Sequence, residues 1–427
     1  MICTIMSLIK RSRIHSIKAH KITEKMIFCS QISQTDKESG YQTMNVLLYD
    51  MGSYMYDDLL YFLQKAGCHC KSIYYHFPDK FKDEFFCRRF NTCLEETSYD
   101  LVISINFFPL VAELCYSHHL KYLSWCYDSP LEERLTEYFS YDTNRIFLFD
   151  RMEWEDFNRA GFRQVFHLPL AVNTLRLDSL SFSSEQIQKY TADVSLVGQI
   201  YSSPLSSLLS PASDYCRGFV EALVQSQLLL YGCYLIDDLI TDELLDSMNE
   251  AYRSLGQENT VLTRRGLSFA IASQITTLER TLLLDEMSGP YDTVLYSSSK
   301  PTSLSHVRFG GSVSYLNEMP AVFRYSRINL NPALKCIRSG IPLRALDIMG
   351  SGGLLLSSWQ PELAEAFSDG EELILYGSLE EAVEKADFYL KREDLRKKIA
   401  QKGYEKTDRQ FSYPGQLKKM FRLSGLN

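Results

Sequence analysis

Short runs of apolar residues alternate with longer amphipathic segments along most of the chain. In the first half, the runs predicted as strands are 46–49, 71–75, 100–105, 121–126, 145–149 and 164–168. Segments with helical spacing lie between them, at 56–65, 81–96, 110–116 and 154–160. Short apolar strands joined by helices predict a parallel sheet that is covered on both faces. We place this first Rossmann-like domain at 44–173.

The same alternation returns after a polar stretch at 174–191, which we interpret as a linker. A second domain is predicted at 192–410, with an insertion at 206–286 whose apolar residues recur every three or four positions, as in helices. The predicted strands are 192–198, 293–296, 307–309, 328–330, 354–357 and 372–376, and the helices are 342–349, 379–390 and 395–407. The pattern therefore predicts an α/β protein with two doubly wound domains facing a cleft, where ligands bind at the carboxyl ends of the strands.

The two ends of the chain differ from this pattern. Residues 1–43 are rich in lysine and arginine and show no sustained periodicity. We predict that they are a disordered extension, or that the start codon has been assigned too early and the functional chain begins near Met44. At the other end, 411–427 forms a tail, and its return to the N-terminal domain is one alternative.

Composition restricts the class of protein further. A chain of 427 residues, 45% of them hydrophobic, is long enough for two or three domains with cores of their own. A net charge of −8 argues against nucleic acid or anionic lipid as the main partner. No apolar run reaches the roughly 18–20 residues needed to cross a bilayer. The eleven cysteines are mostly scattered singly, so we expect reduced thiols in a cytoplasmic protein. Cys68 and Cys70 flank His69 without a second ligand pair, so no metal site is predicted.

The segment 338–353 carries the clearest functional signal. Pro342 suits the first position of a helix, and the preceding amides of Ser339 and Gly340 are expected to point outward, where an anion is favoured. Arg344 lies in the first turn, and Asp347 lies five residues beyond Pro342, about 7–8 Å along the axis. A diphosphate at the helix start and a ribose hydroxyl on Asp347 fit this spacing. The alternative is an ordinary crossover in which the arginine and the aspartate are merely solvated.

Several motifs together resemble GT-B glycosyltransferases. Residues 168–173 are similar to the segment that ends their first domain, and 194–198 to the strand and glycine that open their second. More specifically, the chain resembles the CgeB-type family of bacterial spore-maturation glycosyltransferase-like proteins, over about residues 45–420. The matching pieces are 125–130, 146–151, 319–323, 328–331 and 339–344.

This resemblance implies roles for the donor side. Asp347 takes the place of the second glutamate of the Glu-x7-Glu motif of retaining relatives, which binds the ribose. The place of the first glutamate falls on Ser339, a departure that leaves the stereochemistry open. No arginine–lysine pair follows Gly198 at the spacing of those enzymes, so the diphosphate charge falls to Arg338, Arg344 and the helix amides. Residues that resemble the loop against the base complete the donor side: Phe309, Gly310 and Gly311.

The first domain offers a candidate for the reaction itself. Asp128 follows a predicted strand and is expected to project into the cleft, where a carboxylate can take the proton of an acceptor hydroxyl. The alternative is that Asp128 caps a helix with Pro130 in its first turn. Asp50, Ser53 and Tyr127 are candidates for contacts with the acceptor or the sugar, and a position in the core or at its rim is the alternative for Tyr127.

The sequence thus predicts a glycosyltransferase that moves a sugar from a nucleotide-diphosphate donor, UDP-type by preference, to an acceptor hydroxyl of a glycan, cell-envelope or spore-coat component. No cofactor is expected. A metal is not expected either, because no Asp-x-Asp motif stands at a strand end and the pair Asp237 and Asp238 lies within the helical insertion. Two alternatives remain open. One is a catalytically silent GT-B module that binds a glycan or a partner, and the other is a nucleotide-sugar epimerase.

Overall fold

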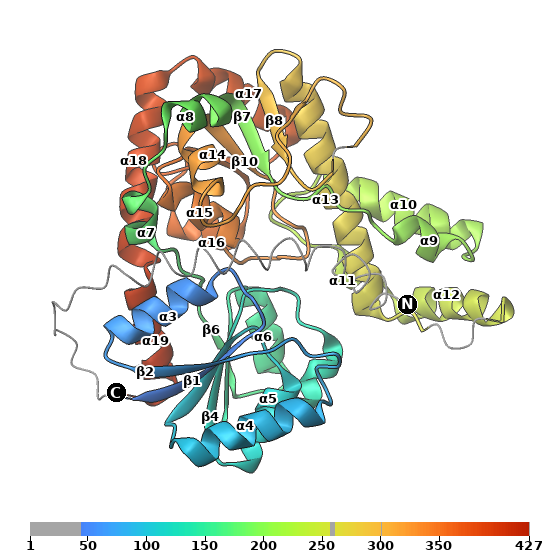
Figure 1. The fold of residues 1–427 in the computed structure, drawn as a ribbon. Helices are drawn as coiled ribbons and strands as arrows, with labels where there is room; N and C mark the ends of the chain where they lie inside the picture. The colour runs from blue at the N-terminus through green and yellow to red at the C-terminus, as the bar shows by residue number, and fades with distance from the viewer. Residues whose placement is uncertain (1–43, 257–260, 300, 427) are drawn as a thin grey trace. The chain divides into compact units, whose positions relative to one another are not determined.

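Two parallel sheets of six strands each form the protein (Figure 1). The computed structural model describes residues 44–256, 261–299 and 301–426, so the predicted extension at 1–43 lies outside the described residues. Every pairing between neighbouring strands of the two sheets is parallel. The predicted α/β architecture with two doubly wound domains is confirmed.

The first sheet has the order β2-β1-β3-β4-β5-β6. Its strands are β1 (Asn45–Asp50), β2 (His69–Tyr74), β3 (Leu101–Ile105), β4 (Lys121–Cys126), β5 (Asn144–Leu148) and β6 (Val165–His167). The connections contain α3 (Tyr56–Lys65), α4 (Glu84–Glu96), α5 (Pro109–Ser117), a 3₁₀ helix at Glu133–Tyr138 and α6 (Arg151–Arg159). All five residues of β3 are buried, as expected for an inner strand with helices on both faces.

The second sheet has the order β12-β11-β10-β7-β8-β9. Its strands are β7 (Ala192–Val197), β8 (Thr293–Tyr296), β9 (Arg308–Phe309), β10 (Ser326–Asn331), β11 (Leu355–Ser358) and β12 (Ile374–Tyr376). Its other helices are α14 (Met319–Tyr325), α15 (Leu343–Gly350), α16 (Pro361–Ala366), α17 (Leu379–Leu390) and α18 (Glu393–Gln410). The sequence pattern did not predict α14 and α16, two short helices with a proline in the first turn.

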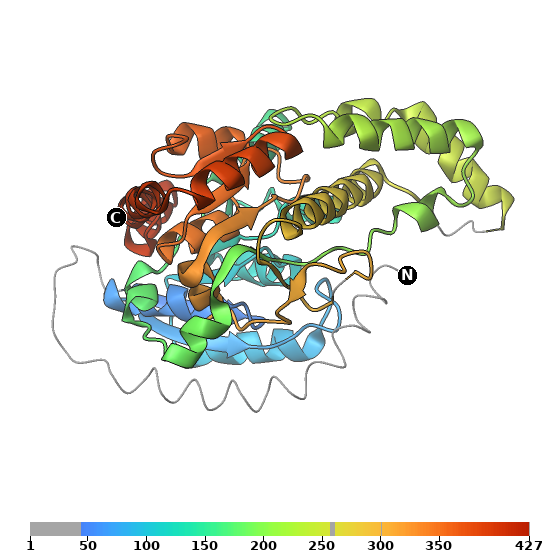
Figure 2. The ribbon, with the colours of Figure 1, turned by 90° about the horizontal axis from the view of Figure 1, so that it is seen from above.

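The helical insertion between β7 and β8 is confirmed and has a hydrophobic core of its own. It consists of α9 (Leu205–Leu209), α10 (Asp214–Leu228), α11 (Ile236–Leu239), α12 (Asp242–Ser254) and α13 (Arg264–Ser288). In both ribbon views, the yellow-green helices α9, α10 and α12 extend away from the sheets (Figures 1 and 2). The long helix α13 returns from this extension to the second domain, where it packs on α17.

The segments around the second domain are also helical. The stretch interpreted as a linker contains α7 (Thr174–Ser179) and α8 (Ser184–Tyr190), each with a side-chain cap at its start. The tail contains α19 (Tyr413–Leu423), which packs on α3 of the first domain. The rings of Phe62 and Tyr413 stack with centroids 5.2 Å apart, and Lys121 Nζ donates to the carbonyl of Ser424 at 3.2 Å.

The strand orders fix where a ligand can bind. In the first sheet the order reverses between β1 and β3, and in the second between β7 and β10. Successive connections leave such a point in opposite directions, so a crevice opens beyond the carboxyl ends of the two strands. Asp50 ends β1, and Gly198 directly follows β7. The crevice beyond β7 and β10 is the candidate donor site described next.

Candidate active site

An arginine of the insertion spans the crevice of the second sheet. Arg280 of α13 donates from Nη1 to the carbonyl of Gln199 at 2.6 Å and from Nε and Nη2 to the carbonyl of Pro332 at 3.2 and 3.0 Å. These carbonyls lie just beyond β7 and β10. A Cβ atom on Gly198 would lie 3.3 Å from Nη1, so glycine leaves room for the guanidinium there. Arg280 thus places a fixed positive charge where the sequence pattern predicted none.

A second arginine lies close to the first. Arg344, in the first turn of α15, contacts the sulfur of Met319 and lies over the ring of Phe323 at 5.4 Å. Burial lowers the pKa of Arg344, whereas the charge of Asp347 raises it. The charge of Arg280 lowers it further. Two neighbouring guanidinium groups repel each other unless an anion lies between them. A diphosphate would relieve this repulsion.

Asp347, the predicted ribose ligand, is buried beside Arg344. Its carboxylate accepts a hydrogen bond from Tyr315 Oη at 2.9 Å and lies 4.0 Å from the Arg344 guanidinium. Burial raises the pKa of Asp347 to about 6, although Arg344 and the Tyr315 hydroxyl favour the charged form. Asp347 borders a pocket of about 170 Å³ together with Arg176 and Tyr315. This volume is below the roughly 300–1,000 Å³ of typical ligand pockets, so a nucleotide needs the surrounding side chains to move apart.

Three residues that the sequence analysis missed connect Asp347 to the first domain. Asp58 of α3 is buried and forms an ion pair with Arg176 of α7, with Nε 3.0 Å from Oδ1. The Arg176 guanidinium lies 5.8 Å from the ring of Tyr315, which donates to Asp347. These side chains come from three separate segments. The connection follows from tertiary packing, and no spacing along the sequence indicates it.

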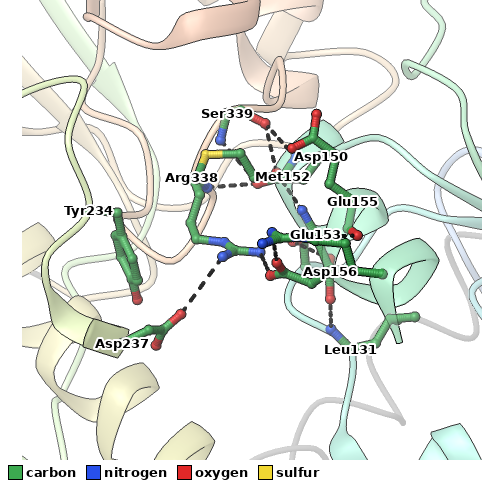
Figure 3. A network of polar contacts seen from close by, with 12 residues as sticks. Leu131, Asp150, Met152, Glu153, Glu155, Asp156, Tyr234, Asp237, Arg338 and Ser339 are labelled. Carbon is green, nitrogen blue, oxygen red and sulfur yellow. Dashed lines mark hydrogen bonds and ion pairs between the residues drawn. The ribbon is translucent and has the colours of Figure 1, made fainter. Parts of the chain in front are cut away.

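The start of the predicted phosphate-binding segment is occupied by the first domain (Figure 3). Asp150 accepts hydrogen bonds from the backbone N–H groups of Arg338 and Ser339 at 2.6 and 3.2 Å. Ser339 is completely buried, and a Cβ atom on Gly340 would lie 2.8 Å from the Asp150 backbone. The expectation that the amide of Ser339 faces outward is therefore wrong, because the Asp150 carboxylate already satisfies it, and the Asp150 backbone packs closely against Gly340.

Ser339 joins two buried carboxylates from different domains. Its Oγ lies 2.8 Å from Asp150 Oδ1 and 2.9 Å from Glu362 Oε1, within hydrogen-bond distance of both. Glu362 also accepts from the backbone N–H of Arg151 at 2.8 Å and pairs with His167 at 2.9 Å. We call Asp150, Ser339 and Glu362 the interdomain cluster. At Ser339, where the resemblance to retaining glycosyltransferases would place a glutamate, a third carboxylate would meet these two.

Arg338 points away from the crevice at Gly198. Its guanidinium pairs with Asp156 of α6 and lies 4.0 Å from Asp237 of α11, as Figure 3 shows. The helix α15 begins one residue later than predicted, with Pro342 in the N-cap position. Of the cations expected for a diphosphate, Arg344 borders the donor crevice, and Arg338 connects the first domain to the insertion.

The first-domain candidates lie at the carboxyl ends of β1 and β4. Asp50 Oδ1 accepts from the backbone N–H groups of Gly52 and Ser53 at 2.6 and 3.2 Å, which shapes the turn after β1. Asp128 is exposed and accepts from Asn106 Nδ2 at 2.7 Å. The cap alternative for Asp128 is wrong, because the next helix begins at Glu133 with Glu132 in the N-cap position. Asn106 orients Asp128 from a left-handed backbone, with φ of 65°.

The remaining predicted residues are Tyr127 in the first domain and 309–311 at the edge strand β9 of the second sheet. Tyr127 has its hydroxyl 3.4 Å from that of Tyr413, and burial raises its pKa, with Asp58 and Asp347 close enough to add to the effect. Phe309 is 43% exposed. Gly310 packs against the ring of Tyr296, which a Cβ atom would strike, and Gly311 has φ of +72° with open space beside it. The loop 309–311 therefore combines an exposed aromatic ring with two glycines, whose missing side chains would let a base approach the backbone.

Comparisons with known proteins agree with this geometry. Residues 264–422 match a family described as glycosyl transferase-like. The sucrose-phosphate synthase of Thermosynechococcus elongatus superposes with a TM-score of 0.54 at 12% identity, covering 89% of this chain and 98% of that one. The chain has the GT-B fold. The search of curated proteins found no match.

Two further solved structures have lower TM-scores. A glycosyltransferase from Rickettsia africae has a TM-score of 0.48 at 10% identity, covering 90% of this chain and 98% of that chain. The Anabaena protein Alr3699/HepE, solved in complex with UDP-glucose, has a TM-score of 0.49 at 12% identity, covering 90% of this chain and 100% of that chain.

Within 44–256, 261–299 and 301–426, no group of three histidine, cysteine, aspartate or glutamate side chains is arranged to hold a metal ion. Among these same residues, no helix is both long and apolar enough to span a membrane.

Arg280 could have been found from the sequence by geometry. It lies eight residues before the end of α13, about 12 Å along the helix axis. The following strand, β8, is four residues long, which is about 13 Å. A helix that packs antiparallel to the next strand brings such a residue level with the carboxyl end of that strand. This packing of α13 against β8 was not predicted, because the helices of the insertion were interpreted as a separate unit.

Proposed function

We propose that the protein is a glycosyltransferase that transfers a sugar from a nucleotide-diphosphate donor, UDP-type by preference, to an acceptor hydroxyl. The observation that carries this proposal is the pair Arg280 and Arg344 at the reversal point of the second sheet. Beside them, Asp347 is a buried carboxylate that can accept from ribose hydroxyls. The family match over 264–422 and the GT-B fold support glycosyl transfer as the chemistry.

In the proposed reaction, the two arginines stabilise the leaving diphosphate. Arg280 is held by carbonyls on both sides of the crevice, so its charge is already in place before the bond between the sugar and the phosphate breaks. The electron pair of that bond stays on the phosphate oxygen. The Phe309 loop contacts the base, and Asp347 exchanges its bond with Tyr315 for one with the ribose.

Asp128 is the proposed general base. The acceptor oxygen attacks the anomeric carbon while Asp128 takes its proton, and Asn106 holds the carboxylate in place. An inverting reaction is the course that such a base supports. Asp50, Ser53 and Tyr127 lie on the same side and are proposed to contact the acceptor or the sugar. A glycan or another envelope or spore-coat hydroxyl is the proposed acceptor class.

The test measures binding and release separately. UDP and the other nucleoside diphosphates are screened for thermal stabilisation, because a ligand that binds only the folded state raises the melting temperature. UDP release from UDP-sugars is then followed with an acceptor mixture. Asp128→Asn should reduce release about 10²–10⁴-fold. The matched control is Asp246→Asn, at an exposed position of α12.

Each outcome of this test is informative. If UDP stabilises the protein but no sugar is released, the silent binding module is favoured over the enzyme. If the sugar of the donor changes while UDP stays attached, the epimerase is favoured. If no nucleoside diphosphate raises the melting temperature, the donor site at Arg280 and Arg344 is contradicted.

A further inference from the structure

A second pocket lies between the helical insertion and the second sheet. It has a volume of about 380 Å³ and lies between the loop that joins α10 to α11 and the carboxyl ends of β10 and β11. We call it the insertion pocket and define it by Tyr231, Tyr234, Lys335, Trp359 and Gln360. Neither the motifs nor the family match assigns it a role.

One polar group of the insertion pocket lacks a partner. Gln360 is 6% exposed, and its Nε2 donates to the carbonyl of Ile337 at 3.1 Å. Its Oε1 has no hydrogen-bond partner among the described residues. A buried acceptor without a partner is unfavourable. A ligand that donates a hydrogen bond to Gln360 Oε1 would remove this cost.

The charges around the pocket are balanced. Lys335 Nζ lies 2.9 Å from Oε2 of the fully buried Glu279, which also accepts from the hydroxyl groups of Tyr231 and Tyr376. Arg338, at the edge, pairs with Asp156 and lies near Asp237. Each cation thus faces a carboxylate. A phosphate or diphosphate gains little from this environment, which favours a neutral ligand.

Aromatic side chains form the mouth of the pocket. Trp359 is 38% exposed, and Gly232, with φ of +73°, packs against its ring so closely that a Cβ atom would strike it. Tyr231 presents its ring to Lys335, with Nζ 4.0 Å from the centroid. An aromatic rim beside an amide and an ammonium group suits a sugar, whose hydroxyl groups both donate and accept while its C–H face packs on a ring.

We propose that the insertion pocket binds one neutral sugar residue of the acceptor glycan. One hydroxyl donates to Gln360 Oε1, a neighbouring hydroxyl accepts from Lys335, and the apolar face of the sugar packs on Trp359. Two adjacent residues of α13 then contribute to two different sites. Arg280 lies at the donor site, and Glu279 holds Lys335 at the sugar-binding pocket. That the sugar belongs to an acceptor rests on the proposed glycosyl transfer, but the binding of a sugar by the pocket does not.

The experiment titrates the full-length protein with methyl glycosides of glucose, galactose, mannose and N-acetylglucosamine, up to 50 mM. Binding is followed by tryptophan fluorescence and by calorimetry. At least one glycoside should bind saturably. Gln360→Met, which keeps the volume and removes the acceptor, should weaken binding about five- to tenfold. Trp359→Phe should abolish the fluorescence change while calorimetry still detects binding. Gln401→Met, at an exposed position of α18, is the matched control and should change nothing.

Three results would overturn the proposal. They are the absence of saturable binding by every glycoside, an unchanged affinity in folded Gln360→Met, and displacement of the glycoside by uridine, which would make the pocket a nucleoside site. Saturating UDP separates the two proposals. If a glycoside binds but UDP does not, the pocket stands and the donor site fails. If UDP binds but no glycoside does, the reverse holds.

Discussion

The two ends of the segment 338–347 have opposite roles in the structure, although the sequence pattern predicts a single phosphate-binding element. At the start, Ser339 is completely buried and bonded to carboxylates of both domains. At the end, Arg344 and Asp347 border the donor crevice, where burial raises the pKa of the carboxylate to about 6. The start is saturated with internal partners, whereas the end holds charges that an external ligand can satisfy.

This difference shows how a motif position can change its use without a change of fold. The relatives that the chain resembles carry a glutamate where Ser339 stands. Here the N-terminal domain contributes a carboxylate, Asp150, to the amides at that place. A negative charge is thus present at the motif position. It comes from the first domain, however, and its hydrogen bonds connect the two domains.

The largest effect is expected from restoring the motif residue with Ser339→Glu. A third buried carboxylate next to Asp150 and Glu362 should lower the free energy of unfolding by about 4 kcal/mol or more. Urea denaturation measures the loss, and Ser339→Ala, which removes only the hydroxyl, is the control at about 1–2 kcal/mol. If the glutamate variant is as stable as the wild type and turns over faster, the interdomain cluster is not the reason for the serine.

Removal of the Asp150 carboxylate should also destabilise the start of the segment 338–347. Asp150→Ala leaves the amides of Arg338 and Ser339 buried without partners and is expected to cost about 3–4 kcal/mol of stability. Asp150→Asn keeps one acceptor oxygen and should cost less. Equal melting temperatures for Asp150→Ala and the wild type would mean that the cluster contributes no stability.

A pair of arginine variants compares the two ends directly. Arg344→Gln should weaken UDP binding about 10- to 100-fold, because a hydrogen bond to a charged group contributes about 1.5–3 kcal/mol. Arg338→Gln removes the ion pair with Asp156 instead and should leave UDP affinity within about twofold, with a stability loss near 1 kcal/mol. Calorimetry of UDP binding measures both. Equal losses of affinity would mean that the segment acts as a single element after all.

The last prediction concerns the pH dependence of stability. The pKa of Asp347 rises from 3.8 to about 6 on folding, so the folded state binds the extra proton between these values. Stability should therefore fall as pH rises from about 4 to about 6, and the cost should persist at pH 7. Asp347→Asn carries no charge, so it should be about 1–3 kcal/mol more stable than the wild type at pH 7.

The control for Asp347→Asn is the pH profile itself. The gain should shrink as the pH falls to 4 and disappear below that, because the wild-type carboxyl is protonated in both states only at a pH well under 3.8. Urea midpoints at pH 4 and pH 7 test the sign. A gain that is the same at both pH values would show that burial does not perturb this carboxyl.

The fold could be predicted from the sequence because each strand is a local signal. The predicted bounds of α3, β4, β8 and α17 coincide with the observed ones, since apolar runs, glycine stops and caps act within a few residues. The short helices α14 and α16 were missed because fewer than two helical turns carry too little periodicity to be distinguished from a loop.

The site could be predicted only in part, because its remaining members depend on contacts between distant segments. Asp347 and Arg344 lie one turn apart on α15, so the spacing alone brought them together. Asp150 reaches Ser339 across 189 positions, and Arg280 reaches Gln199 across 81. Nothing in a local pattern shows that an amide is already bonded to a carboxylate of another domain, so Ser339 and Gly340 were assigned to a ligand.

The packing of α19 on the first domain has a consequence for synthesis on the ribosome. Buried side chains of the last helix, including Tyr413, Leu417 and Phe421, complete the surface of a domain whose strands are translated first. Until residue 423 has left the exit tunnel, that apolar surface has no cover. The first domain of the nascent chain can therefore complete its packing only after the whole second domain has been synthesised. A stalled or truncated chain should present this surface to chaperones, and a supplied α19 peptide should compete for it.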